Sequence, residues 1–166
     1  MAEIARIEKL NVVMLKVTLS AAREAIEQMN LATPLTRRAG NPSSYWYGPD
    51  CWYLASNSKT ANEIINECET RLGSILYNAV DYSASLAAFR VSGNDASDIL
   101  ASGTGIDLRP SKFPADSSNR TRLAGILAMI TARENGYELF VERSYARYME
   151  DWLNDTASII SMATAS

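Results

Sequence analysis

The chain has 166 residues, of which 47% are hydrophobic and 21% charged, with a net charge of −3 and no histidine. This size and composition predict a soluble globular domain with a core of its own. The weak negative charge excludes a surface built for nucleic acid or anionic membranes. The absence of histidine excludes Ser-His and Cys-His nucleophile pairs and most catalytic zinc sites.

Targeting signals and cysteine usage favour a cytoplasmic protein. The longest apolar run, LAGILAMITA at residues 123–132, falls well short of the roughly 20 residues that a membrane helix needs. The first residues, MAEIARIEKLN, lack the basic start and apolar stretch of a signal peptide. Cys51 and Cys68 have neither CxxC nor zinc-ribbon spacing, so we expect two buried thiols and no metal site.

Five elements are predicted in the first half of the chain. Residues 9–19 are rich in Val and Leu and form a strand, and Ser20 is expected to be the N-cap of a helix over 21–30. The strands SSYWY (43–47) and WYLAS (52–56) flank a Gly-Pro-Asp turn. Thr60 and Glu63 form a capping box, which opens a helix that ends before Gly73. The apolar stripe of this helix comprises Ile64, Ile65, Cys68 and Leu72.

The second half of the chain repeats this order. A strand at 85–93 precedes a short helix at 94–102 and an irregular segment at 103–119. Strands follow at 120–125, 126–133 and 137–143, the last two separated by a Glu-Asn-Gly turn that is typical of a hairpin. A final helix starts at Ser144, and its apolar stripe comprises Tyr145, Tyr148, Met149, Trp152, Leu153, Ile159 and Ile160.

Two successive βαββα patterns predict an α+β fold. We expect a duplicated domain in which antiparallel sheets carry helices on one face. No linker or low-complexity segment divides the chain. The prediction is therefore a single domain, residues 1–166, made of two intertwined halves at about 8–80 and 81–162.

The hairpin in the first half holds five aromatic residues within nine positions, Tyr45 to Tyr53. If the turn preserves the pairing, Tyr45, Tyr47, Trp52 and Leu54 share one face, and Trp46 and Tyr53 share the other. Helices of the domain can cover only one of two aromatic faces. We therefore predict that one face joins the core and the other contacts a partner through Trp46 or Trp52. Core alone and a small-ligand platform are the alternatives.

The irregular segment from Gly103 to Asn119 is predicted to be a docking loop, because loops of this length are usually functional or disordered. We expect Arg109 and Phe113 to contact another subunit. Leu108 replaces the third glycine of a dinucleotide fingerprint, so the glycines here indicate only a helix stop and a turn. The short basic pairs at 37–38 and 120–122 favour solvated surface or partner salt bridges over an anion site.

Five motifs occur in order along the chain. They are YWYGPDCWYL (45–54), Asp81-x-Ser83 before a strand, SGNDASDIL (92–100), GIDLRPSKFP (105–114) and RSYARYMEDWL (143–153). Their order and spacing, from about Lys9 to Asp155, resemble the gamma subunit family of heterotetrameric sarcosine oxidase. This family resembles in fold the folate-binding domain of glycine-cleavage aminomethyltransferases, in which ferredoxin-like halves are duplicated and interlocked.

The resemblance implies that the cofactors lie on other subunits of the complex. In such oxidases FAD, FMN, NAD and tetrahydrofolate lie on the larger alpha and beta subunits, and a small delta subunit holds zinc. No catalytic, cofactor-binding or metal-binding residue is therefore expected in this chain. Two departures from the aminomethyltransferases agree with that expectation: Ala84 takes the place of the His that follows Asp-x-Ser, and AGILAMITAR (124–133) lacks their Asp.

Two functions from different classes follow. The first is a non-catalytic gamma-type subunit that supports the assembly of cofactor-carrying partners. That complex would demethylate sarcosine or another N-methyl amine oxidatively and pass the one-carbon unit to tetrahydrofolate. The second is a stand-alone folate- or pterin-binding protein of the aminomethyltransferase type, with a pocket between its halves. The first is favoured, with alpha, beta and delta-type subunits as partners.

Overall fold

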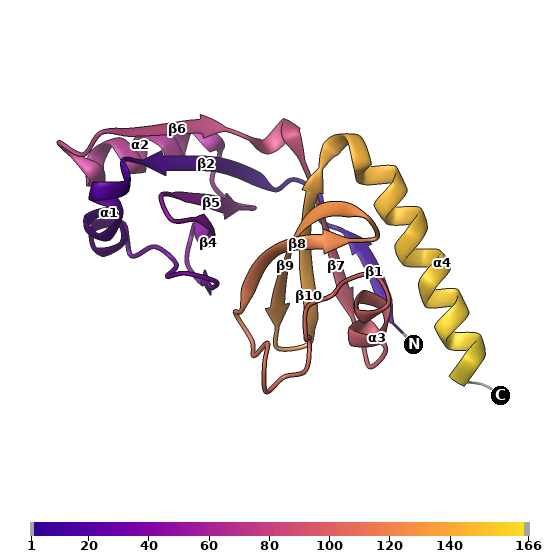
Figure 1. Cartoon of the computed structure of the whole chain (residues 1–166). Coiled ribbons are helices and arrows are strands. Elements are labelled where there is room, and N and C mark those ends of the chain that lie inside the picture. The colour runs from indigo at the N-terminus through magenta and orange to yellow at the C-terminus, as the bar shows by residue number, and fades with distance from the viewer. Residues whose placement is uncertain (1, 165–166) are drawn as a thin grey trace. The chain divides into compact units, whose positions relative to one another are not determined.

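The computed structural model describes residues 2–164, which form two compact units (Figure 1). The first unit comprises residues 9–84, and the second comprises residues 2–8 together with residues 85–164. The chain therefore begins in the second unit, builds the whole of the first and then returns. Each unit has its own five-stranded antiparallel sheet.

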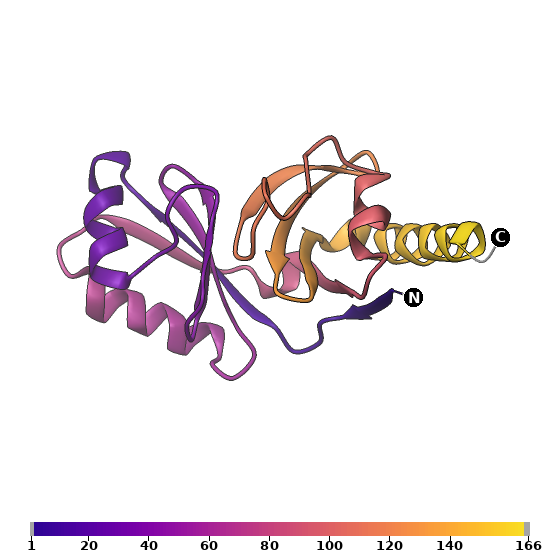
Figure 2. The same ribbon diagram turned by 90° about the horizontal axis from the view of Figure 1, so that it is seen from below.

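The first unit packs two helices on one face of its sheet. Its elements are β2 (Asn11–Val17), the 3-10 turn η1 (Leu19–Ala21), α1 (Ala22–Met29), β3 (Arg37–Arg38), β4 (Ser43–Gly48), β5 (Cys51–Ser56), α2 (Ala61–Leu72) and β6 (Tyr77–Asp81). The strand order is β3-β4-β5-β2-β6. Figure 2 shows α1 and α2 on the same side of the strands, and the two helices contact each other.

Inward-facing side chains, which alternate along the strands with outward-facing ones, build the core of this unit. Val13 and Leu15 of β2 are fully buried, as is Leu54 of β5, and all three contribute to one apolar cluster. From α2 the cluster receives Ile64, Cys68 and Leu72, the spacing expected for one helix face. The predicted stripe of α2 is thus the face that the sheet covers.

The start of α2 agrees with the sequence prediction, whereas the start of α1 does not. At α2 the capping box is present: the Glu63 amide donates to the Thr60 hydroxyl, and the Thr60 amide donates to the Glu63 carboxylate. The prediction that Ser20 caps α1 is wrong. A 3-10 turn precedes α1, its N-cap is Ala21, and the Ser20 hydroxyl donates to that of Thr18 instead.

The second unit contains the longest helix among the described residues. Its elements are β1 (Glu3–Arg6), β7 (Leu86–Ser92), α3 (Ala96–Ala101), β8 (Ser118–Leu123), β9 (Ile126–Arg133), β10 (Gly136–Glu142), the 3-10 turn η3 (Arg143–Tyr145) and α4 (Ala146–Thr164), with the turn η2 (Ser83–Ser85) before β7. The strand order is β1-β7-β10-β9-β8. The apolar cluster of this unit is built from the sheet, α3 and α4.

The two sheets have the same topology, which confirms the predicted duplicated α+β fold. In both, the strand before the first helix lies between an edge strand and the last strand before the second helix. The edge strand β6 follows α2 in the first unit. In the second unit the corresponding edge strand is β1, from the start of the chain, which pairs with β7. The sequence patterns missed both of these edge strands.

Candidate functional site

The aromatic hairpin has a register that differs from simple alternation. Trp46 pairs with Trp52 and Tyr45 with Tyr53, whereas Gly48 pairs with Cys51. Between these pairs lies a β-bulge, so the strand before the turn holds one extra residue, Tyr47. Directly paired residues point to the same face. The predicted face assignment is therefore wrong, because one bulged residue shifts every side chain before it.

Both tryptophans consequently face the core of the first unit. The Trp52 side chain has no exposed surface, and its indole N–H donates to the Ala32 carbonyl oxygen at 2.8 Å. Trp46 is half-buried against the same cluster. Because its side chain is completely buried in this unit, Trp52 has no surface left to contact a partner. A contact through Trp46 stays a prediction for the exposed part of its ring.

The opposite face of the hairpin is a tyrosine layer. Tyr53 lies 4.8 Å from Tyr47 and 5.9 Å from Tyr82, measured between ring centroids. Tyr45 borders the layer, and the guanidinium of Arg37 lies 5.6 Å from its ring centroid while donating to the Ser43 hydroxyl. The aromatic density of this stretch thus supplies both faces of one sheet, with indoles on one side and phenols on the other.

The irregular segment between α3 and β8 is held by its own turns and by the second unit. Leu108 is buried, and its carbonyl oxygen accepts a hydrogen bond from the Tyr137 hydroxyl at 3.3 Å. The Phe113 amide donates to the Arg109 carbonyl oxygen, which closes a turn. The Asp116 amide donates to the Ala132 carbonyl oxygen on β9. Part of the predicted docking loop is therefore anchored, with Arg109 exposed and Phe113 half-buried.

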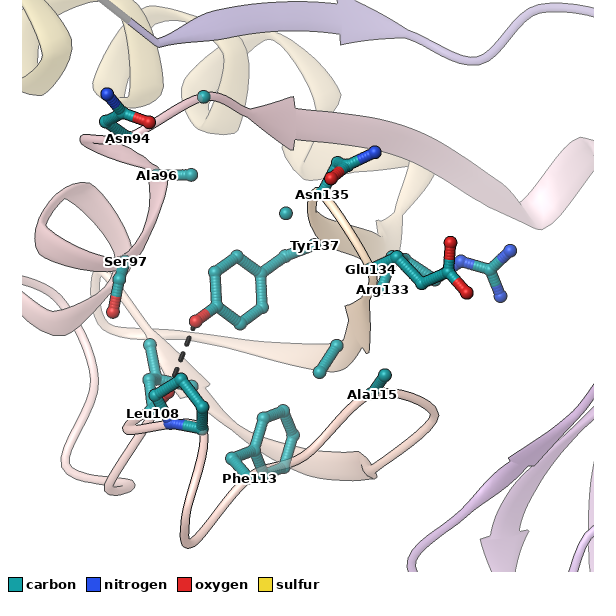
Figure 3. A pocket seen from close by; sticks show the side chains of 14 residues that line it. Asn94, Ala96, Ser97, Leu108, Phe113, Ala115, Arg133, Glu134, Asn135 and Tyr137 are labelled. Carbon is teal, nitrogen blue, oxygen red and sulfur yellow. Dashed lines mark hydrogen bonds between the residues drawn. The ribbon is translucent and has the colours of Figure 1, made fainter.

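A pocket of about 460 Å³ lies in the second unit, beneath this segment (Figure 3). The Tyr137 ring stands in its middle, Phe113 lies on one side, and Asn94 and Asn135 lie at the opposite edge. Arg133 also lines the pocket, but its guanidinium is bound by the carboxylates of Asp116 at 3.3 Å and Glu138 at 3.8 Å. The lining thus combines aromatic rings and amides with the side chains of Arg133 and Glu134.

One exposed ion pair, Arg109 with Asp107, lies within the segment. The Arg109 guanidinium Nε lies 2.9 and 3.0 Å from the two carboxylate oxygens of Asp107. Hydrogen bonds from the Arg109 side chain and backbone amide lower the pKa of Asp107 from 3.8 to about 2. Both groups are solvent-exposed, so this local pair orders the turn more than it stabilises the fold.

This pair predicts a titration that can be measured directly. Because the pKa of Asp107 is depressed in the folded chain, the stabilising effect of its charge is present above about pH 4 and is lost as the pH falls towards 2. Carboxyl ¹³C NMR should give Asp107 a midpoint near pH 2, and Arg109→Ala should return that midpoint towards 3.8. The same midpoint in both proteins would contradict the pairing.

The Asp81-x-Ser83 motif serves its own turn. The Asp81 carboxylate accepts hydrogen bonds from the Ser83 amide at 3.0 Å and from the Ser83 hydroxyl at 2.6 Å, which lowers the pKa of Asp81. The Ser83 oxygen in turn accepts from the Val12 amide at 3.0 Å and so ties the turn to β2. At the next position Ala84 offers only a methyl group. These residues thus hold the turn between β6 and β7.

Cys51 and Cys68 are buried and unlinked, and burial raises the pKa of Cys68 to about 12. Between residues 2 and 164 no cluster of three or more Cys, Asp or Glu residues could hold a metal ion. No helix in that range is long and apolar enough to cross a membrane.

Similar solved structures show the class of fold. The heterotetrameric sarcosine oxidase from Corynebacterium sp. U-96, in complex with pyrrole 2-carboxylate, contains a chain that matches with a TM-score of 0.82 and 21% identity, over 96% of this chain and 85% of that chain. Aminomethyltransferase T of the glycine cleavage system from Bartonella henselae matches with a TM-score of 0.69 and 14% identity, over 92% of this chain and 45% of that one. The fold is therefore that of the aminomethyltransferase-like α+β proteins.

The family is identified by sequence. The model of the sarcosine oxidase, gamma subunit family matches residues 16–159. Because this match spans most of the sequence, the chain belongs to the sarcosine oxidase gamma subunit family, as its ordered motifs predicted. No curated protein matches the sequence.

Proposed function

We propose that this chain is the non-catalytic gamma subunit of a cytoplasmic, heterotetrameric, flavin-dependent oxidase or dehydrogenase that demethylates sarcosine or a related N-methyl amine. The family match over residues 16–159 carries the proposal. The fold supports it, because a heterotetrameric sarcosine oxidase contains a chain of the same topology along almost its full length.

In this proposal the chemistry belongs to the partners. Alpha- and beta-type subunits carry FAD, FMN, NAD and tetrahydrofolate, and a delta-type subunit completes the assembly. The gamma chain contributes a folded surface against which the larger subunits assemble. The use of Asp81 and Ser83 within their own turn supports this role, since these polar groups are already engaged in holding β2.

The test compares the purified chain with its complex. The chain alone should be colourless in the visible flavin bands and should not oxidise sarcosine. Co-expression with the genes for the larger subunits should yield a coloured, active complex that retains the chain, and omission of the chain should lower the yield of that complex. Stoichiometric flavin on the isolated chain, or turnover by it alone, would contradict the proposal.

The same preparation distinguishes the second function. A stand-alone folate-binding protein would bind tetrahydrofolate in calorimetry without any partner. We expect no binding heat from the isolated chain, because Ala84 replaces the imidazole of the aminomethyltransferases and Asp81 is committed to Ser83. Saturable binding with one site per chain would favour the second function.

A further inference from the structure

A second pocket, of about 190 Å³, lies in the first unit, where the end of α1, the residues after β3 and the second half of α2 meet. Its apolar lining includes Leu31 and Leu54, which are both buried. The charged residues in its lining are Arg38, Glu67 and Arg71. Segments far apart in the sequence thus bring two guanidinium groups and one carboxylate to a single small cavity.

The carboxylate of Glu67 is engaged by two cations. One of its oxygens accepts a hydrogen bond from the Lys59 ammonium at 2.6 Å, and the other lies 3.1 Å from the Arg71 guanidinium. The Glu67 side chain is only 21% exposed, so the two cations compensate a carboxylate that is largely removed from water. Glu67 therefore pairs with Lys59 and Arg71, and not with Arg38.

Arg38 has no carboxylate partner among the described residues. Its guanidinium donates a hydrogen bond to the side-chain oxygen of Asn30, which is neutral. Neighbouring residues of a strand point to opposite faces, and Arg37 accordingly lies over the Tyr45 ring and donates to Ser43. The basic pair at 37–38, which the sequence pattern assigned to solvated surface or salt bridges, is thus divided, and only Arg38 lines the pocket.

The charges around the pocket do not cancel. Three cations, Arg38, Lys59 and Arg71, accompany one carboxylate, Glu67, which leaves two positive charges in excess. This local excess contrasts with the net charge of −3 for the whole chain. A planar guanidinium matches the oxygens of carboxylates and phosphates through paired hydrogen bonds. A phosphate dianion also balances both excess charges, whereas a single carboxylate balances only one.

We propose that this pocket binds a phosphate group, free or as a small monoester, through the guanidinium groups of Arg38 and Arg71. The buried side chains of Leu31 and Leu54 provide an apolar lining for the carbon atoms of a monoester. The inference is independent of the proposed function, because assembly with larger subunits does not require this site.

Titration of the ¹⁵N-labelled full chain with inorganic phosphate, at constant ionic strength, tests the site. Amide shifts in NMR spectra should saturate at millimolar phosphate and be confined to residues 29–31, 38–44 and 67–71. Arg38→Gln and Arg71→Gln should each weaken binding at least tenfold, because each removes charge-assisted hydrogen bonds. Arg23→Gln is the matched control: it removes the same charge from α1, about 9 Å along the helix from Met29, and should bind phosphate as the wild type does.

All three arginines are exposed, so thermal melts of the variants should match the wild type. If Arg38→Gln alone melts earlier, Arg71→Gln on α2 provides the comparison. Absence of saturable shifts in the wild type, or equal binding by Arg23→Gln and both pocket variants, would overturn the site. Acetate that binds as tightly as phosphate would overturn the choice of a dianion.

Glycerol phosphate distinguishes the two sources of the phosphate group. Tighter binding than inorganic phosphate, lost in Arg38→Gln, would support a monoester that uses the apolar lining. Equal or weaker binding than inorganic phosphate, again lost in Arg38→Gln, would support free phosphate as the ligand.

Discussion

Trp52→Ala is expected to lower the free energy of unfolding by about 3–5 kcal/mol, the usual cost of removing a large buried ring. The Trp52 side chain is completely enclosed, so its loss leaves a cavity between the sheet and the helices of the first unit. It also leaves the buried Ala32 carbonyl oxygen without its indole donor. Urea denaturation followed by far-UV circular dichroism measures the change.

Trp46→Ala is the matched control, since Trp46 is the direct cross-strand neighbour of Trp52 and only half-buried. It removes the same ring from the same face but less buried area, so the loss should be clearly smaller. Equal losses in the two variants would contradict the different burial of the two rings.

Gly136→Ala should destabilise the second unit by about 3 kcal/mol or more, through strain and a backbone clash together. Gly136 begins β10 with a φ of 138°, a conformation that residues with a side chain rarely adopt. A Cβ atom here would lie 2.2 Å from the Val91 carbonyl oxygen on β7. The paired strands cannot separate locally without losing ladder hydrogen bonds, so the clash should appear in the free energy of unfolding measured in urea.

Gly105→Ala provides the comparison within the same unit. A Cβ atom at Gly105 meets no atom within 4 Å, and the backbone there does not have a positive φ. Its effect should stay within about 0.5 kcal/mol. A similar stability for Gly136→Ala and Gly105→Ala would show that β7 and β10 are not packed as the structure has them.

Local chemistry made several elements predictable from sequence. The capping box of Thr60 and Glu63 fixed the start of α2, and Asn135-Gly136 marked the turn between β9 and β10. Periodic patterns gave the order of the main elements: strand, helix, two strands and helix in the first unit, and strand, helix, three strands and helix in the second. These signals are readable because they depend on residues close together in the chain.

Features set by tertiary pairing were not predictable. β1 has four residues and acquires its strand conformation by pairing with β7, which lies far along the chain. The bulge at Tyr47 has no sequence signature of its own, yet it decided which face of the hairpin each tryptophan occupies. The stripe of α4 was predicted as one surface, but packing divides it into a buried part at Met149 and Leu153 and an exposed part at Ile159.

Of the residues predicted to contact a partner, one is buried in the core and the others are wholly or partly exposed. Trp52 belongs to the core, whereas Arg109 is exposed beside Asp107 and Phe113 lines a pocket. Exposure depends on what the rest of the chain covers, which no single stretch of sequence encodes. Contacts of Trp46, Arg109 and Phe113 with another subunit stay predictions that a structure of the complex can test.

Native mass spectrometry of the chain co-expressed with the larger flavoprotein subunits tests the central claim most directly. The account predicts one assembly that contains a single copy of this chain with the larger subunits, and flavin mass only on those subunits. A chain that remains alone while the larger subunits form an active, flavin-loaded complex without it would contradict the assignment as a gamma subunit.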